Sequence, residues 1–401
     1  MAMLLEGVRV LDLTNVIAGP LCSLQLAMLG AEVIKVEVPG SGDLSRKLGT
    51  DLELGRRLMG TSFLAMNAGK KSLTLNLKHP RGKALFLDLV RGADVVFENF
   101  RPGTMQRLGL GYDDLKPVNP ALVYCAVSGF GQDGPLSQRP SYDQIIQGFS
   151  GLMSVTGTAE SAPLRAGYVV CDSMAAIVAA FAIAAALFKR ARTGEGEMID
   201  VSMLDASLST MAAWAVSNVL NAGLTPRPVG NENPTSSPSG TFRTGDGQIN
   251  IVCNEEKQFH RLCEAIGLPE LLQDARFNLR PNRLAHRGVL RELLEAKLAE
   301  RSSLEWEAIL TEAGVPVGPI LSLPEMLAHP HVAARELIRR FPDVPVVERE
   351  IGVTRPGFHL ASGLPDVARP PPVLGEDTEA ILGELGLSAA EIADLRKEGA
   401  I

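Results

Sequence analysis

The pattern of hydrophobic and polar residues in the first part of the chain predicts strands joined by helices. Residues 8–13 and 32–37 are predicted strands, and residues 21–29 between them form a predicted helix that Gly30 closes. A strand, a helix and a second strand in this order are typical of a parallel sheet, which binds ligands at the carboxyl ends of its strands. The sequence therefore predicts an α/β fold.

Further strand patterns follow along the first half of the chain, at residues 72–77, 94–98, 122–127 and 198–201. A helix with a period near 3.6 residues follows His79, and a second apolar helix is predicted over residues 204–222. Parallel strands deliver their carboxyl ends to one edge of the sheet, so we expect the loops after these strands to meet there.

A stretch rich in Pro, Asn and Ser after residue 224 is the clearest boundary in the chain. Beyond it come a predicted strand at residues 247–252 and charged helices, and the tail returns to strands and an end helix from Ser388. We therefore expect a large domain over residues 1–224, a small α+β domain over residues 225–325, and a return to the large domain over residues 326–401.

The stretch from Pro163 to Leu187 places one carboxylate at the start of the most apolar helix of the chain. After Asp172 and Ser173, a run of Ala, Ile and Leu predicts a helix that is buried nearly all round. One interpretation is that Asp172 or Ser173 caps this helix by accepting a backbone N–H. The other is that Asp172 is a nucleophile held by the same donors. The two roles are compatible, and this stretch alone leaves both open.

The composition indicates a globular protein without a nucleic-acid partner. The 401 residues are 46% hydrophobic and 21% charged, and the net charge of −7 argues against the basic surface that nucleic-acid binding needs. The apolar run at residues 174–188 is shorter than the ~18–20 residues of a membrane span, so we expect a core helix and no membrane association.

Five cysteines in apolar contexts, without CxxC spacing, indicate reduced and buried thiols: Cys22, Cys125, Cys171, Cys253 and Cys263. The start of the chain lacks a basic stretch followed by an apolar one, so no export signal is indicated. We therefore expect a cytoplasmic protein.

Several basic residues follow the predicted strands or lie in the loops between them: Lys70, Lys71, Lys78, Arg101, Arg107 and Arg139. Any one of them alone is more often a solvated surface cation. Their recurrence at one sheet edge of an acidic protein favours an anionic ligand with several phosphates.

The motifs of several common chemistries are absent from the sequence. The loop after the first strand holds a single glycine, Gly19, where a dinucleotide fold needs three, although Glu37 stands near the place of its ribose-binding acid. We found no HExxH motif or other metal-ligand cluster, no GxSxG elbow and no phosphate-binding P-loop. A metal site, a bound dinucleotide and ATP-driven chemistry are therefore disfavoured.

Ordered blocks along nearly the whole chain resemble the class III CoA-transferases of the CaiB/BaiF type, which include formyl-CoA transferase. They are residues 5–13, 18–20, 29–37, 40–43, Asn67 with residues 70–72, 98–103, 129–132, 163–165 with Asp172, 314–316 and 371–376.

This resemblance implies a Rossmann-like large domain built from both chain ends, a smaller α+β domain and an interlocked homodimer. It also implies that Asp172 is the nucleophile, which forms an aspartyl anhydride and then an aspartyl-CoA thioester. The substrates would be an acyl-CoA and a free carboxylic acid, with no permanently bound cofactor. The CoA contacts of the family fall on Val16, Ala18, Leu75, Lys78, Asn99, Phe100, Arg107, Tyr142 and Asp143.

Two residues depart from the formyl-CoA transferase pattern. Ile17 stands where that enzyme has Gln, and Val38 stands where it has an Arg at the nucleotide. We therefore expect other small mono- or dicarboxylates as substrates, with succinyl-CoA as a candidate donor. The Gly-, Ser- and Pro-rich loop at residues 230–240 is interpreted as a lid or, equally, as a structural linker.

Two other functions compete with CoA transfer. An α-methylacyl-CoA racemase resembles this chain in fold and CoA site, but its proton transfer needs a His opposite the Asp, and Tyr142 occupies the matching position. A non-catalytic CoA-binding protein would keep the basic loops and could dispense with Asp172.

Overall fold

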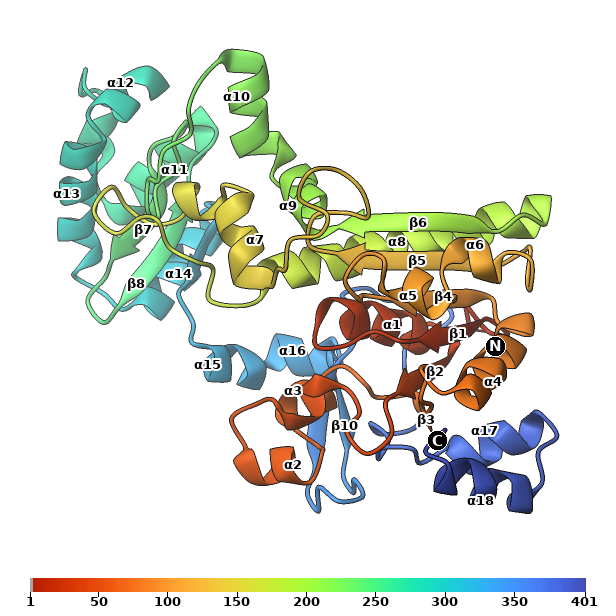
Figure 1. Cartoon of the computed structure of the whole chain (residues 1–401). Coiled ribbons are helices and arrows are strands. Elements are labelled where there is room, and N and C mark those ends of the chain that lie inside the picture. The colour runs from red at the N-terminus through yellow and green to blue at the C-terminus, as the bar shows by residue number, and fades with distance from the viewer. Residues whose placement is uncertain (1–2) are drawn as a thin grey trace. The chain divides into compact units, whose positions relative to one another are not determined.

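The computed structural model describes residues 3–401 and contains a six-stranded sheet in which every pairing is parallel (Figure 1). Its strands are β1 (Arg9–Asp12), β2 (Glu32–Glu37), β3 (Lys71–Thr74), β4 (Val95–Glu98), β5 (Val123–Ser128) and β6 (Glu197–Ser202), in the spatial order β3-β2-β1-β4-β5-β6. The prediction of a parallel α/β sheet is confirmed. Because the strand order reverses between β1 and β4, a ligand crevice is expected outside the carboxyl ends of these two strands.

Helices cover both faces of this sheet, which is why its central strands appear in the sequence as apolar runs. One face packs on α1 (Ala18–Met28), α8 (Val170–Thr193) and α9 (Met203–Thr210). The other packs on α4 (Pro80–Arg91) and on the two C-terminal helices, α17 (Thr378–Glu384) and α18 (Ala389–Lys397). Both ends of the chain therefore build the same core.

The described chain also contains these short helices: α2 (Leu52–Arg56), α3 (Thr61–Leu64), α5 (Thr104–Leu108), α6 (Tyr112–Leu115), α7 (Asp143–Phe149), α10 (Ser217–Ala222) and α16 (Pro330–Ala334). The predicted helix at residues 204–222 is divided into α9, a π-helical turn (Ala212–Val216) and α10. A two-stranded sheet of β10 (Ile338–Phe341) and β11 (Ile351–Thr354) joins the core on the α1 side.

The start of α1 lies unusually close to the loop after β1, and glycine makes this approach possible. A Cβ atom on Gly19 would lie 2.2 Å from the Cβ of Thr14, far inside van der Waals contact. The residue before the helix, Ile17, offers no side-chain cap. The first N–H groups of α1 are therefore left for a partner outside the helix.

The apolar helix predicted after Asp172 is α8, but its burial differs from the prediction. Ala175, Ala179 and Ile183 are buried, whereas Ile177 and Phe181 are 56% and 74% exposed. The expectation of burial nearly all round was therefore wrong, because only one side of α8 faces the sheet and α1.

The helix is also longer than the apolar run, since residues 170–173 and the basic end 189–193 continue it to 24 residues. Among the described residues α8 alone is long and apolar enough to cross a membrane by length and composition, a test that a core helix also passes.

Residues 153–164 and 225–332 form a second compact unit, and the remaining described chain forms the first. The main segment of this unit is residues 225–332, and the domain bounds that we expected from the sequence stay a prediction. It has its own apolar core and an antiparallel sheet. Its elements are β7 (Ser239–Arg243), β8 (Gln248–Val252), β9 (Val317–Pro319), α11 (Glu256–Ile266), α12 (Arg280–Ala285), α13 (Arg287–Leu298), α14 (Ser303–Glu312) and α15 (Leu323–Ala328).

Within the second unit, arginines of α12 and α13 hold the loop that was interpreted as a lid or a linker. Arg283 donates to the carbonyl of Ser237 at 2.9 Å, and Arg287 donates to the carbonyl of Asn233 at 2.7 Å. Arg291 donates to the carbonyl of Thr241 at 2.6 Å, within β7, directly after the loop. These bonds to consecutive parts of the loop favour the linker over the lid.

A buried ion pair joins β2 to the loop that follows it. The guanidinium of Arg46 is fully buried and donates to both carboxylate oxygens of Glu37, at 2.7 Å each. It also lies 3.7 Å from the ring centre of Phe63 and donates to the carbonyl of Pro372. This single side chain therefore connects the first and last parts of the sequence.

We predict that Arg46→Met lowers the free energy of unfolding by about 3–5 kcal/mol near neutral pH, because Glu37 is left as a buried charge without its ion-pair partner. Burial alone raises the pKa of Glu37, but the hydrogen bonds and charge of Arg46 outweigh burial and lower it. The stability that the pair contributes is therefore present above the unfolded pKa of about 4.3 and is lost as the pH falls. Urea unfolding from pH 7 to pH 3 should show the difference shrinking.

Arg396→Met is the matched control, because Arg396 pairs with Glu379 at the surface. We expect a change within about 0.5 kcal/mol, as exposed pairs contribute little. Equal losses in the two variants would contradict the prediction.

Candidate active site

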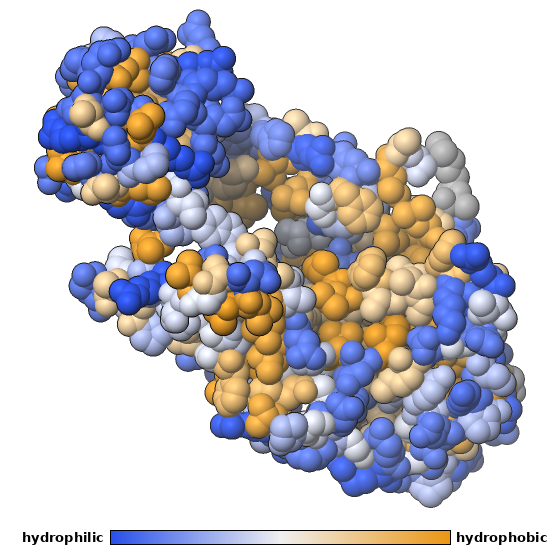
Figure 2. Space-filling view, turned by 90° about the horizontal axis from the view of Figure 1, so that it is seen from above, coloured by the Kyte–Doolittle hydropathy of each residue, from blue (hydrophilic) through white to orange (hydrophobic). Residues whose placement is uncertain are grey.

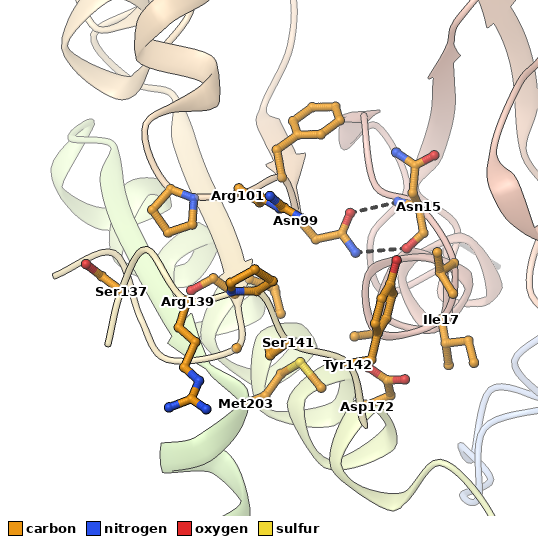
Figure 3. A pocket seen from close by; sticks show the side chains of 18 of the residues that line it. Asn15, Ile17, Asn99, Arg101, Ser137, Arg139, Ser141, Tyr142, Asp172 and Met203 are labelled. Carbon is orange, nitrogen blue, oxygen red and sulfur yellow. Dashed lines mark hydrogen bonds between the residues drawn. The ribbon is translucent and has the colours of Figure 1, made fainter. Parts of the chain in front are cut away.

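A cavity of about 340 Å³ opens at the carboxyl ends of β1, β4 and β5, where the strand order predicts a crevice. Its walls come from the loop after β1 (residues 15–18), the loop after β4 (residues 99–102), the residues after β5 (128–129) and residues 137–142. Asp172, at the start of α8, completes the lining together with Met203 (Figure 3). The loops that we expected to meet therefore do meet.

Asp172 is the third residue of α8, and its carboxylate accepts no hydrogen bond from the residues that the structure describes. The cap of this helix comes from Asp143 in α7, whose Oδ1 accepts the backbone N–H of Cys171 at 2.8 Å and that of Asp172 at 3.2 Å. The interpretation of Asp172 or Ser173 as the N-cap was therefore wrong. Because Asp143 serves the helix end, the carboxylate of Asp172 is left to face the cavity.

The electrostatics of Asp172 differ from those of a surface carboxyl group. Burial, and then the negative charge of Asp143, raise the pKa of Asp172 to about 7. A carboxylate that is poorly solvated and lacks hydrogen-bond donors is a stronger nucleophile than one in water, and such shifts are common at catalytic sites. The position and environment of Asp172 therefore fit a covalent role.

Asp143 itself is held in a small hydrogen-bonded network. Its Oδ2 accepts the side-chain amide of Gln147 at 2.5 Å, and the Oε1 of Gln147 accepts the backbone N–H of Ala166 at 2.8 Å. These bonds fix the carboxylate against the start of α8. The contact of Asp143 with CoA, implied by the family resemblance, stays a prediction.

The other predicted contact residues lie along two cavities. Val16, Ala18, Asn99 and Tyr142 line the cavity of Asp172. Leu75 and Lys78 line a second cavity of about 540 Å³, together with Val38 and residues of the loops after β1 and β2. Phe100 and Asn15 line both cavities, and the exposed Arg107 lies in neither but donates to Thr104, which lines the second. Seven of the nine predicted contact residues therefore line these two cavities, and their contact with CoA stays a prediction.

In the wall of the first cavity, the side-chain amide of Asn99 is hydrogen-bonded to the backbone of Asn15 (Figure 3). The Oδ1 of Asn99 accepts the backbone N–H of Asn15, and its Nδ2 donates to the carbonyl of Asn15, each at 2.8 Å. Tyr142 and Ile17 lie on the same side of the cavity as Asp172 (Figure 3). The side chain of Tyr142 is 69% exposed, so it is accessible to a ligand.

Two of the cations that we expected to bind an anionic ligand have structural roles instead. Lys70 is fully buried beside Asp12, at 3.1 Å, and burial lowers its pKa to about 8. Lys71 pairs with Glu32 at 2.5 Å. The side chains of Lys78 and Arg101 lie at the cavities without a carboxylate partner in the described chain, and Arg139 stacks on Phe149 at 4.6 Å.

A buried acid that the sequence analysis did not single out, Glu98, stands directly before the loop at residues 99–102 that lines the cavity. Glu98 ends β4 and accepts the backbone N–H of Phe100 at 2.7 Å and the hydroxyl of Tyr124 at 3.3 Å. Burial raises its pKa to about 7. The available signal was its place at the end of an apolar strand, directly before the Asn-Phe-Arg-Pro-Gly loop.

Across residues 3–401, no group of three or more His, Cys, Asp or Glu side chains is arranged to hold a metal ion. The five cysteines are buried and unpaired.

Comparisons with known proteins agree on one family. The sequence model of CoA-transferase family III matches residues 5–378. The chain is 38% identical over 388 residues to the succinate–glutarate CoA-transferase of Agrobacterium fabrum, with 95% of each chain covered. It is 40% identical over 338 residues to the acetyl-CoA:oxalate CoA-transferase of Acetobacter aceti, with 83% of this chain and 85% of that protein covered.

Comparison with solved structures leads to the same family. A crystal structure of a CaiB/BaiF family protein from Brucella suis matches with a TM-score of 0.84 and 34% identity, over 96% of this chain and 100% of that chain. The resemblance inferred from the sequence is therefore confirmed, and the chain belongs to CoA-transferase family III.

Proposed function

We propose that the protein transfers CoA from an acyl-CoA thioester to a free carboxylic acid through covalent intermediates on Asp172. The observation that carries this proposal is the carboxylate of Asp172, which faces the crevice without a hydrogen-bond donor while Asp143 caps the helix behind it. The names of the family relatives support the same class of reaction.

The first half of the reaction moves CoA from the donor acyl group to Asp172 and releases the donor acid. An oxygen of Asp172 attacks the thioester carbonyl, the C–S bond breaks, and a mixed anhydride and CoA thiolate form. The thiolate then attacks the aspartyl carbonyl, the anhydride C–O bond breaks, and the donor acid leaves as a carboxylate. The enzyme now carries an aspartyl-CoA thioester.

The second half runs the same steps in reverse with the acceptor acid. Its carboxylate attacks the aspartyl thioester and releases CoA thiolate, which attacks the acceptor carbonyl of the new anhydride. The new acyl-CoA leaves and the carboxylate of Asp172 is restored. One thioester replaces another, so no ATP is consumed.

Each of these attacks places negative charge on a carbonyl oxygen. The start of α1 supports its stabilisation, because Val16, Ile17 and Ala18 line the cavity of Asp172 and Ile17 supplies no cap. Backbone N–H groups at a helix start are oriented before the reaction begins and cost no reorganisation when the oxyanion forms.

CoA enters this scheme as a substrate, with no permanently bound cofactor. We place it along the two cavities, which share Asn15 and Phe100, with Lys78 and Arg107 toward its phosphates. Small mono- or dicarboxylic acids are the proposed partners of the exchange, and succinyl-CoA is the proposed donor. The name of the Agrobacterium relative, a succinate–glutarate CoA-transferase, supports this choice.

We further propose an interlocked homodimer in the cytoplasm, in which the two units of each chain serve as its domains. The outer side of α8 supports a second copy, because Phe181 and Phe188 are 74% and 65% exposed. Trp214, Leu220 and Leu224, after α9, are large, apolar and exposed as well. Figure 2 shows that apolar residues gather in broad patches on the face it presents, as association surfaces do.

We predict that wild-type protein mixed with the donor acyl-CoA and treated with hydroxylamine or borohydride carries a covalent mark on Asp172. Succinyl-, acetyl- and formyl-CoA form the donor panel, and peptide mass spectrometry locates the mark. Asp172→Ala and Asp172→Asn should lose the mark and lower kcat/KM by at least about 10³-fold, because the nucleophile is removed.

Asp172→Asn also provides the folding control. A raised pKa means that ionisation of Asp172 weakens folding above its unfolded pKa of about 3.9, so the amide should unfold at no lower temperature than wild type at pH 8. Absence of any mark, together with deuterium exchange at the α-carbon of an acyl-CoA, would favour the racemase. Normal turnover by Asp172→Ala would remove this residue from the mechanism.

The charge of Asp143 gives a prediction on pH dependence. Adduct formation should rise with pH through about 7, as Asp172 ionises. Asp143→Asn keeps an oxygen that can accept the N–H groups of Cys171 and Asp172 but removes the charge, so the pKa of Asp172 should fall and the rise should move to lower pH. Rapid-quench measurement from pH 5 to pH 9 tests this; an unchanged or higher midpoint would contradict it.

The proposed dimer predicts that Phe181→Glu weakens self-association, because it places a charge on the exposed apolar side of α8. Sedimentation velocity should show dimers for wild type and monomers, or a raised dissociation constant, for the variant. Leu52→Glu, at an equally exposed leucine of α2, is the control. Monomeric wild-type protein at micromolar concentration would contradict the proposal.

A further inference from the structure

The loop between β1 and α1 contains a strained residue at the wall of the active-site cavity. Val16 has a φ of 69°, in the left-handed region that β-branched residues rarely occupy. Such a conformation costs about 1–3 kcal/mol and persists only where the surrounding structure imposes it. Val16 lines the cavity of Asp172 and lies two residues before the first residue of α1.

Three consecutive residues of this loop are held by side chains from other elements. The carbonyl of Thr14 accepts the Nζ of Lys35 at 2.8 Å. The backbone of Asn15 is held on both sides by Asn99, as described above. The backbone N–H of Val16 donates to the Oδ1 of Asp43 at 3.0 Å. The third bond acts directly on the strained residue.

Asp43 is itself fixed by charge and by backbone donors. It is buried, its Oδ1 also accepts the N–H of Ser45 at 2.7 Å, and its Oδ2 lies 2.9 Å from the Nζ of Lys35. Its own N–H donates to Glu37 at 2.9 Å. Gly42, with a φ of 61°, permits this approach, because a Cβ there would lie 2.9 Å from the Oε1 of Glu37.

The same Lys35 therefore serves two anchors at once. It comes from the middle of β2, is fully buried, and reaches both the carbonyl of Thr14 and the carboxylate of Asp43. A buried pair of this kind has a defined geometry, since neither charge can turn to water without exposing the other. Lys35 thereby fixes the position of the loop after β1 relative to β2 of the sheet.

We propose that Asp43, supported by Lys35, is a positioning residue that holds Val16 in the left-handed conformation and so fixes the start of α1 in the wall of the cavity that Asp172 lines. This inference rests on the proposed function for its kinetic readout. Without the acceptor at residue 43, Val16 relaxes to a negative φ, and Ile17 and Ala18 turn away from their places in the cavity wall. Glycine at residue 16 adopts the left-handed conformation without strain, so this conformation should depend less on the hydrogen bond from residue 16 to Asp43.

The test compares Asp43→Ala with two double variants. Asp43→Ala is expected to lower kcat/KM by about 10²-fold, as a misplacement near 1 Å does. Adding Val16→Gly should recover at least about 10-fold of this loss, because glycine removes the strain. Adding Leu58→Gly instead should recover nothing: Leu58 has a φ of 58° but lines neither cavity.

Conservative replacement separates positioning from general stability. Asp43→Asn keeps an acceptor oxygen for Val16 and is expected to stay within about threefold of wild type. Val16→Pro leaves the buried pair of Asp43 and Lys35 in place but forces φ to about −65°, so it should lose about 10²-fold even if Asp43→Ala does not fold.

Hydrogen–deuterium exchange gives a readout that does not need turnover. Amide exchange over residues 13–21 should be faster in Asp43→Ala than in wild type. If Asp43→Ala does not fold, Val16→Pro should show the same faster exchange. Exchange in peptides of the second unit should stay unchanged in either variant. Equal rescue by the two glycine variants, wild-type kinetics in Val16→Pro or unchanged exchange would overturn the inference. Wild-type protein that transfers CoA from no donor would overturn the proposed function instead, and the exchange result would still decide the role of Asp43.

Discussion

The site depends on one interaction: the carboxylate of Asp143 accepts the first backbone N–H groups of α8. A helix start attracts negative charge, and the nearest acid normally satisfies it. Because Asp143 takes this place from α7, Asp172 cannot be drawn back onto its own helix. The same arrangement places a second negative charge beside Asp172 and raises the pKa of that residue. Position and reactivity thus have a common cause.

The loops that face Asp172 are held by buried charges rather than by apolar packing alone. Two buried ion pairs, Lys35 with Asp43 and Glu37 with Arg46, join β2 to the segment that follows it. Burial of a charge is costly unless its geometry is satisfied, so such a group tolerates few alternative arrangements. Apolar contacts tolerate more sliding, which suits the outer helices but not a loop that must place backbone atoms within a few tenths of an ångström.

Local pattern was enough to predict the sheet, because β4 and β5 are buried along their whole length and appear in the sequence as apolar runs. The strand at residues 32–37 has the predicted bounds, and the crevice lies at the carboxyl ends of the strands, where the predicted parallel sheet puts it. β7 was missed because its Ser-Gly-Thr start lacks an apolar alternation and belongs to a loop rich in Gly and Ser. Its place depends on the arginines of α12 and α13, which sequence proximity does not reveal.

Prediction of the site from the sequence was limited for the same reason, because the partners of its side chains depend on tertiary packing. Lys70 and Lys78 look alike in the sequence, and only tertiary packing makes one a buried partner of Asp12 and leaves the other at a cavity. The role proposed for Asp172 came from motif resemblance and position. The partner that frees it lies 29 residues earlier. No periodicity connects two residues at such a separation, so the cap of α8 had to be seen in three dimensions.

Burial of Asp172 also bears on the energy of the covalent intermediates. A carboxylate in water is stabilised by hydration, and forming an anhydride from it gives up that stabilisation. At Asp172 much of the hydration is already lost on folding, and no hydrogen-bond donor of the described chain replaces it. The neutral anhydride and thioester lose less by burial than the ion does. The free enzyme is therefore raised in energy relative to its acylated forms, so the folding of α8 against the sheet supplies part of the driving force for the proposed first step.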